Sequence, residues 1–124
     1  MKIRILANTI RYRLRQPEIS LFQESGKVME VTEFGPGLTD GLGFILKVIS
    51  GTELTVSFEY NTTTIGVPRY LAEEWINTDL VGFDGKIDTG KGRIIEVLVE
   101  KDFACLDNPE EDNIGAFPNP KAVC

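Results

Sequence analysis

Histidine is absent from this 124-residue sequence, and the only cysteines are Cys105 and Cys124. Without histidine, a cysteine nucleophile lacks its usual base. A structural zinc site would want four cysteine or histidine ligands, and the chain has two. Two cysteines are also too few for a disulfide framework. These absences favour a protein without catalytic activity, and we predict no catalytic residue and no cofactor.

Long apolar runs are absent as well. The first 15 residues, MKIRILANTIRYRLR, are charged throughout and lack the run of about 7–15 apolar residues that a signal peptide contains. No stretch approaches the roughly 18 apolar residues of a membrane span. We therefore expect a cytoplasmic protein with reduced thiols and no membrane partner.

The composition is that of a folded domain, but its charge is uneven. Hydrophobic residues make up 42% and charged residues 26%, which suits one globular domain over residues 1–124. The net charge is −6; residues 1–50 carry seven Lys/Arg and five Asp/Glu, whereas residues 51–124 carry six and fourteen. An acidic chain disfavours nucleic-acid binding without excluding a local basic patch.

Periodicity predicts a β-rich α+β fold. Apolar and polar residues alternate in strand-like segments, which are 2–6, 10–15, 27–34, 42–49, 53–60, 63–67, 80–84 and 93–101. Pro17 and Pro68 are placed to open two helices, whose inward residues include Phe22 and Trp75. Ile3 and Ile5, like Val56 and Phe58 in the second half, are expected to point inward.

The same pattern occurs twice at an offset of 53 residues, which places Asn8 on Asn61, Leu14 on Val67 and Phe22 on Trp75. The match loosens in the third strand, where Val28 falls on Val81 but Glu30 meets Phe83. We therefore predict a small pseudo-twofold barrel of two tandem ββαββ repeats, residues 1–50 and 51–102.

An irregular C-terminal segment, residues 103–124, is expected to pack on this barrel. It is rich in proline and has no sustained period, so it should be extended. Phe103, Leu106 and Phe117 are its candidate apolar anchors. A loose tail is the alternative.

Residues 63–83, TTIGVPRYLAEEWINTDLVGF, resemble the DNA-binding AbrB-type regulators. In that family two ββαββ chains exchange hairpins to form one barrel, so the resemblance implies both halves in one chain and a DNA-binding role. The sequence departs from the family at residues 77–80, Asn-Thr-Asp-Leu, where a glycine and an acidic residue are usual.

A larger part of the chain resembles a family of small bacterial proteins of unknown function. The shared segments are residues 1–14, the EEW of 73–75, the LVEKDFACLD of 98–107 and the FPNP of 117–120. This resemblance implies a family but no activity.

Four arginines are the best candidates for binding. Arg11, Arg13 and Arg15 alternate along one predicted strand, and Arg4 falls on the outer face of the neighbouring strand. Guanidinium groups in such an array suit carboxylate or phosphate. The alternative is a solvated strand face whose arginines pair with carboxylates of neighbouring strands. Acidic residues of the C-terminal segment could also mask this face.

Asp102, Cys105 and Asp107 form a second, chemically mixed cluster after the last strand. Carboxylates suit hard cations and thiolates suit zinc, so this cluster is a candidate metal site. The alternative is a solvated acidic loop with a buried cysteine.

The sequence favours an uncharacterised binding or interaction protein whose partner is a protein or an anionic ligand. Two alternatives stay open: a metal-binding protein or small enzyme that uses the Asp102 cluster, and a DNA-binding regulator. The oligomeric state is open too.

Overall fold

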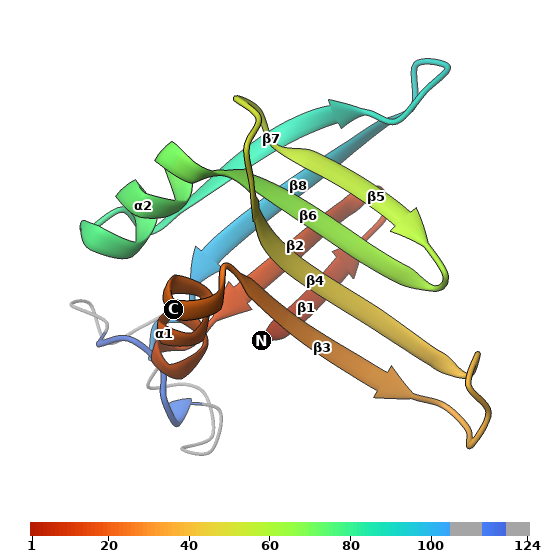
Figure 1. The fold of residues 1–124 in the computed structure, drawn as a ribbon, viewed down its shortest axis with the longest axis horizontal. Coiled ribbons are helices and arrows are strands. Elements are labelled where there is room, and N and C mark those ends of the chain that lie inside the picture. The colour runs from red at the N-terminus through yellow and green to blue at the C-terminus, as the bar shows by residue number, and fades with distance from the viewer. Residues whose placement is uncertain (105–112, 119–124) are drawn as a thin grey trace.

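A computed structural model describes residues 1–104 and 113–118 of the chain. Figure 1 shows its ten elements. Their bounds are β1 Lys2–Leu6, β2 Thr9–Leu14, α1 Gln16–Ser25, β3 Lys27–Glu33, β4 Gly41–Ile49, β5 Thr55–Glu59, β6 Thr62–Pro68, α2 Arg69–Asn77, β7 Gly82–Asp88 and β8 Ile94–Lys101. The protein is therefore β-rich α+β, as the periodicity predicts.

The strands form two four-stranded sheets, which we call sheet A (β1-β2-β8-β7) and sheet B (β3-β4-β6-β5). In each sheet a central parallel pair is flanked by antiparallel partners. Each sheet thus joins a hairpin from the first half of the chain to one from the second half. Both helices lie at the same end of the molecule, and the strands extend away from them (Figure 1).

One apolar core lies between the sheets and under the helices. It consists of Ile10, Tyr12, Leu14, Ile19, Phe22, Val28, Phe44, Leu46, Ile65, Val67, Ala72, Trp75, Val97 and Val99. Strands supply it with alternate residues, as in β2, because successive side chains point to opposite faces of a sheet. In the described part of the chain, no helix covers the other face of either sheet (Figure 1).

The prediction of a closed barrel is wrong. In residues 1–104 and 113–118, β1 and β7 remain the edges of sheet A, and β3 and β5 the edges of sheet B. A barrel closes only when its edge strands pair. Between β5 and β7 side chains occupy the space instead: Val56, Phe58 and Ile87 line a groove there. Leu54 also lies so close to Gly85 that a Cβ on that glycine would approach it to 2.9 Å.

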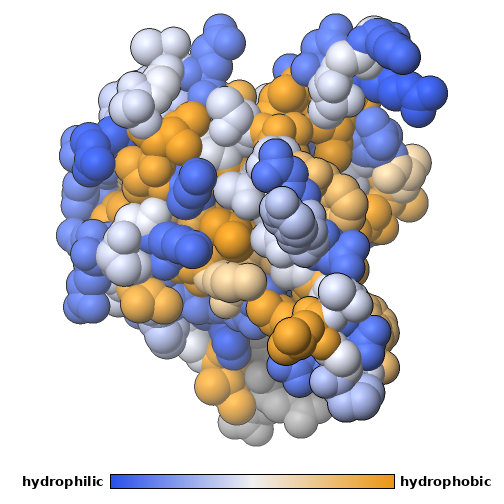
Figure 2. Space-filling view, turned by 45° about the vertical axis from the view of Figure 1, so that its right-hand side comes forward, coloured by the Kyte–Doolittle hydropathy of each residue, from blue (hydrophilic) through white to orange (hydrophobic). Residues whose placement is uncertain are grey.

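Two residues predicted to be inward, Ile5 and Phe58, are exposed instead, by 61% and 63%. Both belong to edge strands, and each is the next-to-last residue of its strand. The C-terminal ends of β1 and β5 point away from the helices (Figure 1). Strand alternation determines the face on which a side chain lies, but it does not determine whether the opposite sheet is long enough to cover that side chain. Apolar side chains consequently appear at many places on the surface (Figure 2).

The residue pairings between strands in the first half of the chain recur in the second half. The β1–β2 pair Lys2↔Arg13 has its counterpart in the β5–β6 pair Thr55↔Gly66, 53 residues further on. The parallel pairs behave alike, since Thr9↔Glu96 corresponds to Thr62↔Gly43. Internal duplication stays a prediction, but this recurrence is the observation that bears on it.

The alignment of the third strand needs correction. Val28 pairs with Leu46, and Phe83 pairs with Val99. Val28 therefore corresponds to Phe83, at an offset of 55, and not to Val81. The physical cause is loop length: the connection before β7 is longer than the one before β3, whereas the loop at 89–93 is two residues shorter than the one at 34–40.

The C-terminal segment is held at the start of α1. Phe103 and Phe117 form a parallel bridge, with their ring centroids 5.9 Å apart. Phe117 also packs against the core. The backbone N–H of Gln16 donates to the carbonyl oxygen of Gly115 at 3.0 Å, which satisfies an amide that the helix cannot pair itself. The third predicted anchor, Leu106, lies outside the described residues.

The buried phenol of Tyr12 leads us to expect that the protein loses stability at alkaline pH. It is fully buried, its hydroxyl donates to the carbonyl oxygen of Thr63 at 3.2 Å, and burial raises the pKa of its phenol well above the ordinary value. Below about pH 10 both states keep this proton; above it only the unfolded chain releases it. This residue should therefore lower the free energy of unfolding by up to about 1.4 kcal/mol per pH unit above pH 10.

Urea unfolding of Tyr12→Phe and of the unchanged protein at several pH values tests this assignment. The variant should lose stability less steeply above about pH 10. Equal slopes for the two proteins would show that Tyr12 ionises without unfolding.

Candidate functional site

The first hairpin presents cations on the outer face of sheet A. Ile10, Tyr12 and Leu14 of β2 point into the core, so the intervening Arg11 and Arg13 point outward. The register between β1 and β2 then sets Arg4 opposite Arg11 and Lys2 opposite Arg13. We call these four residues, Lys2, Arg4, Arg11 and Arg13, the arginine face.

Strand β8 supplies the counter-charge. It runs parallel to β2 and places Glu100 beside Arg13. The Oε1 atom of Glu100, which is buried, lies 3.0 Å from Nε of Arg11 and 4.0 Å from Nε of Arg13. One carboxylate oxygen is thus shared between two guanidinium groups. Leu98 lies beside Arg11 and contributes no charge.

Within the described residues, the arginine face has more cations than carboxylates. Its ion pairs there are those of Glu100 with Arg11 and Arg13, and that of Asp102, whose Oδ2 lies 2.9 Å from Nζ of Lys2. Arg4 is exposed and has no ion pair within the described part of the chain. Like charges directly opposite each other on a sheet repel. The Arg4–Arg11 pair is therefore the least compensated part of the face.

Arg15, the fourth predicted arginine, lies apart from the others. Strand β2 ends at Leu14, and Arg15 is the N-cap residue immediately before α1. Its Nε lies 3.4 Å from Oε1 of Glu18, and its Nη1 donates to the carbonyl oxygen of Ile114 at 3.4 Å. Arg15 therefore holds the helix start and the C-terminal segment instead of extending the arginine face.

Asp102, the first residue of the predicted metal cluster, is committed to other contacts. It is 4% exposed, pairs with Lys2, and its backbone N–H donates to the carbonyl oxygen of Leu14 at 2.8 Å. Cys105 and Asp107 lie outside the described residues. Among residues 1–104 and 113–118, no three Cys, Asp or Glu side chains gather as a metal would require.

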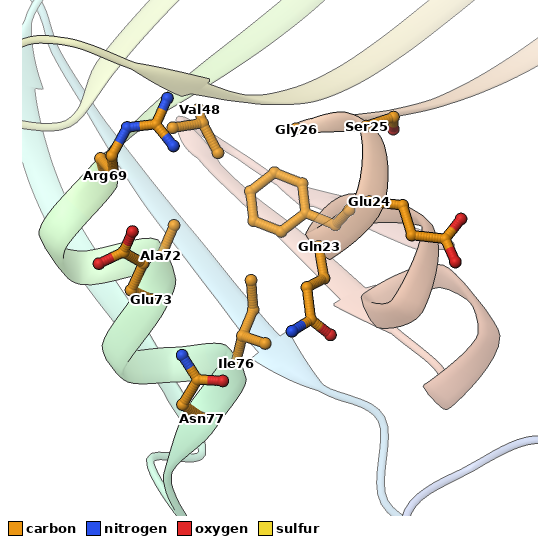
Figure 3. A pocket seen from close by; sticks show the side chains of 11 residues that line it. Gln23, Glu24, Ser25, Gly26, Val48, Arg69, Ala72, Glu73, Ile76 and Asn77 are labelled. Atoms are coloured by element: carbon orange, nitrogen blue, oxygen red, sulfur yellow. The ribbon is translucent and has the colours of Figure 1, made fainter.

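Another groove lies between the two helices. It has a volume of about 450 Å³, an apolar floor that includes Val48 and Ala72, and a polar rim from both helices. In Figure 3 Gln23 extends from α1 toward Ile76 of α2, and Glu24 points away from α2. The rim mixes charges of both signs and contains no buried polar group aimed into the groove, so it defines no ligand chemistry.

Sequence reasoning found the arginines of this face but missed Glu100, the acid that organises them. Glu100 lies 87 residues after Arg13, and no local pattern connects the two. The alternative in which the arginines pair with carboxylates of neighbouring strands describes the contacts of Arg11 and Arg13, but it named no acidic residue. The hairpin exchange implied by the AbrB resemblance was a second signal, because exchange puts the last hairpin of the chain beside the first.

Together these features define a two-sheet α+β protein with a charged outer strand face. Neither helix in the described residues is long and apolar enough to cross a membrane. The chain belongs to DUF7009, a family of unknown function whose model matches residues 1–121. No curated protein and no solved structure matches the chain.

Proposed function

We propose that this chain is a non-enzymatic binding protein whose arginine face takes carboxylate groups from an acidic protein segment. The observation that carries this proposal is the Arg4–Arg11 pair: among the described residues, Arg4 has no carboxylate partner, and Arg11 shares Glu100 with Arg13. A carboxylate held between Arg4 and Arg11 would receive charge-assisted hydrogen bonds and relieve their repulsion.

The overall charge supports an acidic protein segment over a nucleic acid. The chain carries −6 in total, so a long polyanion would meet repulsion beyond the edges of the face. A short acidic segment needs only a few cations and avoids that repulsion. The DNA-binding role implied by the AbrB resemblance is therefore the less favoured proposal, and metal-dependent chemistry at Asp102 stays a prediction without support in the described residues.

The binding proposal predicts that Arg4→Gln combined with Arg11→Gln weakens the binding of a glutamate-rich peptide about tenfold at low salt, which corresponds to about 1.4 kcal/mol. Isothermal titration with that peptide measures the change. Affinity of the unchanged protein should also fall as salt is raised, because exposed charges are screened.

Arg93→Gln is the matched control for this titration. Arg93 is an exposed guanidinium in the turn between β7 and β8 and is not part of the arginine face. Its replacement should leave the affinity unchanged. Because Arg93→Gln removes one charge and the double variant removes two, a loss of binding free energy about half as large in Arg93→Gln would reduce the effect to net charge. Tighter binding of a duplex oligonucleotide than of the peptide would replace the acidic segment by nucleic acid.

We also propose that the two halves are copies of one ββαββ unit. Recurring register supports this origin, and so does the backbone of the first turn in each half. Ala7 and Tyr60 have φ of 48° and 51°, values uncommon for residues other than glycine, and they are 53 residues apart. The backbone N–H groups of Glu96 and Gly43 donate to Asn8 and Asn61 at the same offset.

A further inference from the structure

The outer face of sheet B has few charges and no covering element within the described chain. Its middle rows follow from the register: Met29, Ile45, Thr64 and Ser57 in one, and Val31, Gly43, Thr62 and Glu59 in the next. Met29 is 47% and Val31 49% exposed. The neighbouring glycine and small side chains do not project far from the sheet, so the backbone of another sheet can approach closely.

Charge is distributed along this face by sign. Lys27 and Lys47 lie directly opposite each other at one end of β3 and β4. Glu33 lies at the other end of β3, six residues from Lys27, or about 20 Å along an extended strand. Across residues 1–104 and 113–118, none of these three side chains has an ion pair. The lysine pair therefore lacks a counter-charge within the described part of its own chain.

We infer that this face binds the same face of a second copy of the chain. Two copies stacked face to face by a twofold axis can meet in two simple ways. An axis parallel to the strands would place the lysine end on the second copy's lysine end, which repels. An axis across the strands reverses one copy, so that Lys27 lies over the second copy's Glu33 and Met29 over the second copy's Val31.

The second arrangement satisfies the charges and the apolar rows together. Such an interface is isologous, so each contact occurs twice, and a one-sided distribution of charge along the strand is what makes the face complementary to itself. Another protein would need its own matching gradient of charge, whereas a second copy carries it already.

The size of the face predicts a weak dimer. Four strands spaced about 4.8 Å apart and about 20 Å long present roughly 400 Å² per copy. That is about half of what each partner contributes to an interface of standard size. We expect association in the range of roughly 10 μM to 1 mM, with the arginine faces of sheet A turned outward on both copies.

Sedimentation velocity on the full chain, over about 10 μM to 1 mM, tests this inference. The sedimentation coefficient should rise with concentration. Glu33→Lys should weaken association about tenfold or more, because it places lysine over lysine in both copies of the contact. Adding Lys27→Glu to Glu33→Lys restores opposite charges and should recover most of the association.

Glu73→Lys, an equal change of charge at an exposed position of α2, is the control and should associate like the unchanged protein. Two results would overturn the inference: a monomer throughout the concentration range, or a dimer that Glu33→Lys leaves intact. Both outcomes are independent of peptide binding at the arginine face, since the substitutions lie on the other sheet.

Discussion

Replacing Trp75 with alanine is expected to lower the free energy of unfolding by about 4 kcal/mol, the largest effect that we predict for a single substitution. Trp75 is fully buried where α2 meets both sheets. Its ring lies edge-on to Phe22 at 6.0 Å and to Phe83 at 5.3 Å between centroids. Its Nε1 donates to the carbonyl oxygen of Val81 at 3.0 Å. Alanine would leave a cavity and remove one of the two hydrogen bonds that the Val81 carbonyl oxygen accepts, the other coming from the backbone N–H of Lys101 at 2.9 Å.

Urea unfolding followed by circular dichroism measures this loss without relying on tryptophan fluorescence. Phe58→Ala is the control, because that aromatic ring is mostly exposed and its removal should cost about 1 kcal/mol or less. Trp75→Phe should fall between the two, since it keeps most of the volume but not the N–H donor. A cost for Trp75→Ala no larger than that of Phe58→Ala would contradict the packing described for α2.

Gly82→Ala is expected to cost about 3 kcal/mol, the second largest effect. Gly82 begins β7 opposite Glu100. A Cβ at this position would overlap the carbonyl oxygen of Val99 and come within 3.0 Å of the Cα of Glu100. Both are backbone atoms and cannot turn aside, so β7 would have to move away from the strand that carries Glu100. Urea unfolding measures this loss of stability. The affinity for the peptide should fall as well, because the shift of β7 would disturb the strand that carries Glu100.

Gly41→Ala is the matched control for Gly82→Ala. Gly41 also begins a strand, but a Cβ there would meet the Cγ1 of Val31 at 3.4 Å, an ordinary van der Waals contact. We expect its stability to change by less than about 1 kcal/mol. Similar costs at both glycines would mean that chain flexibility, and not the overlap at Gly82, sets the effect.

Local patterns predicted most of this fold, because each strand has a face on the core and each helix has a clear start. The helix start at Pro17 and the position of Trp75 in the core are examples. Closure was not predictable in the same way. Whether edge strands pair to make a barrel depends on how far two sheets diverge, and that depends on contacts such as Leu54 on Gly85 between distant strands.

In the candidate site, too, local patterns predicted the positions of some residues, whereas contacts between distant strands could not be predicted. Alternation along β2 was enough to place Arg11 and Arg13 on one outer face. Alternation could not show that Arg15 caps a helix, because the strand pattern of the sequence continues through that residue. In the structure the strand ends before Arg15, which is the N-cap of α1. Nor could alternation supply Glu100, which reaches the arginines through a parallel pairing between the two ends of the chain.

The joining of early and late hairpins in each sheet has a consequence for synthesis of the protein. Strand β2 is complete at Leu14, but its second neighbour ends at Lys101. Contacts this far apart in sequence form slowly, because a long loop must close before they stabilise the chain. On the ribosome, the first half therefore emerges with Tyr12 and Leu14 still uncovered, and sheet A can be completed only when nearly the whole chain has been translated.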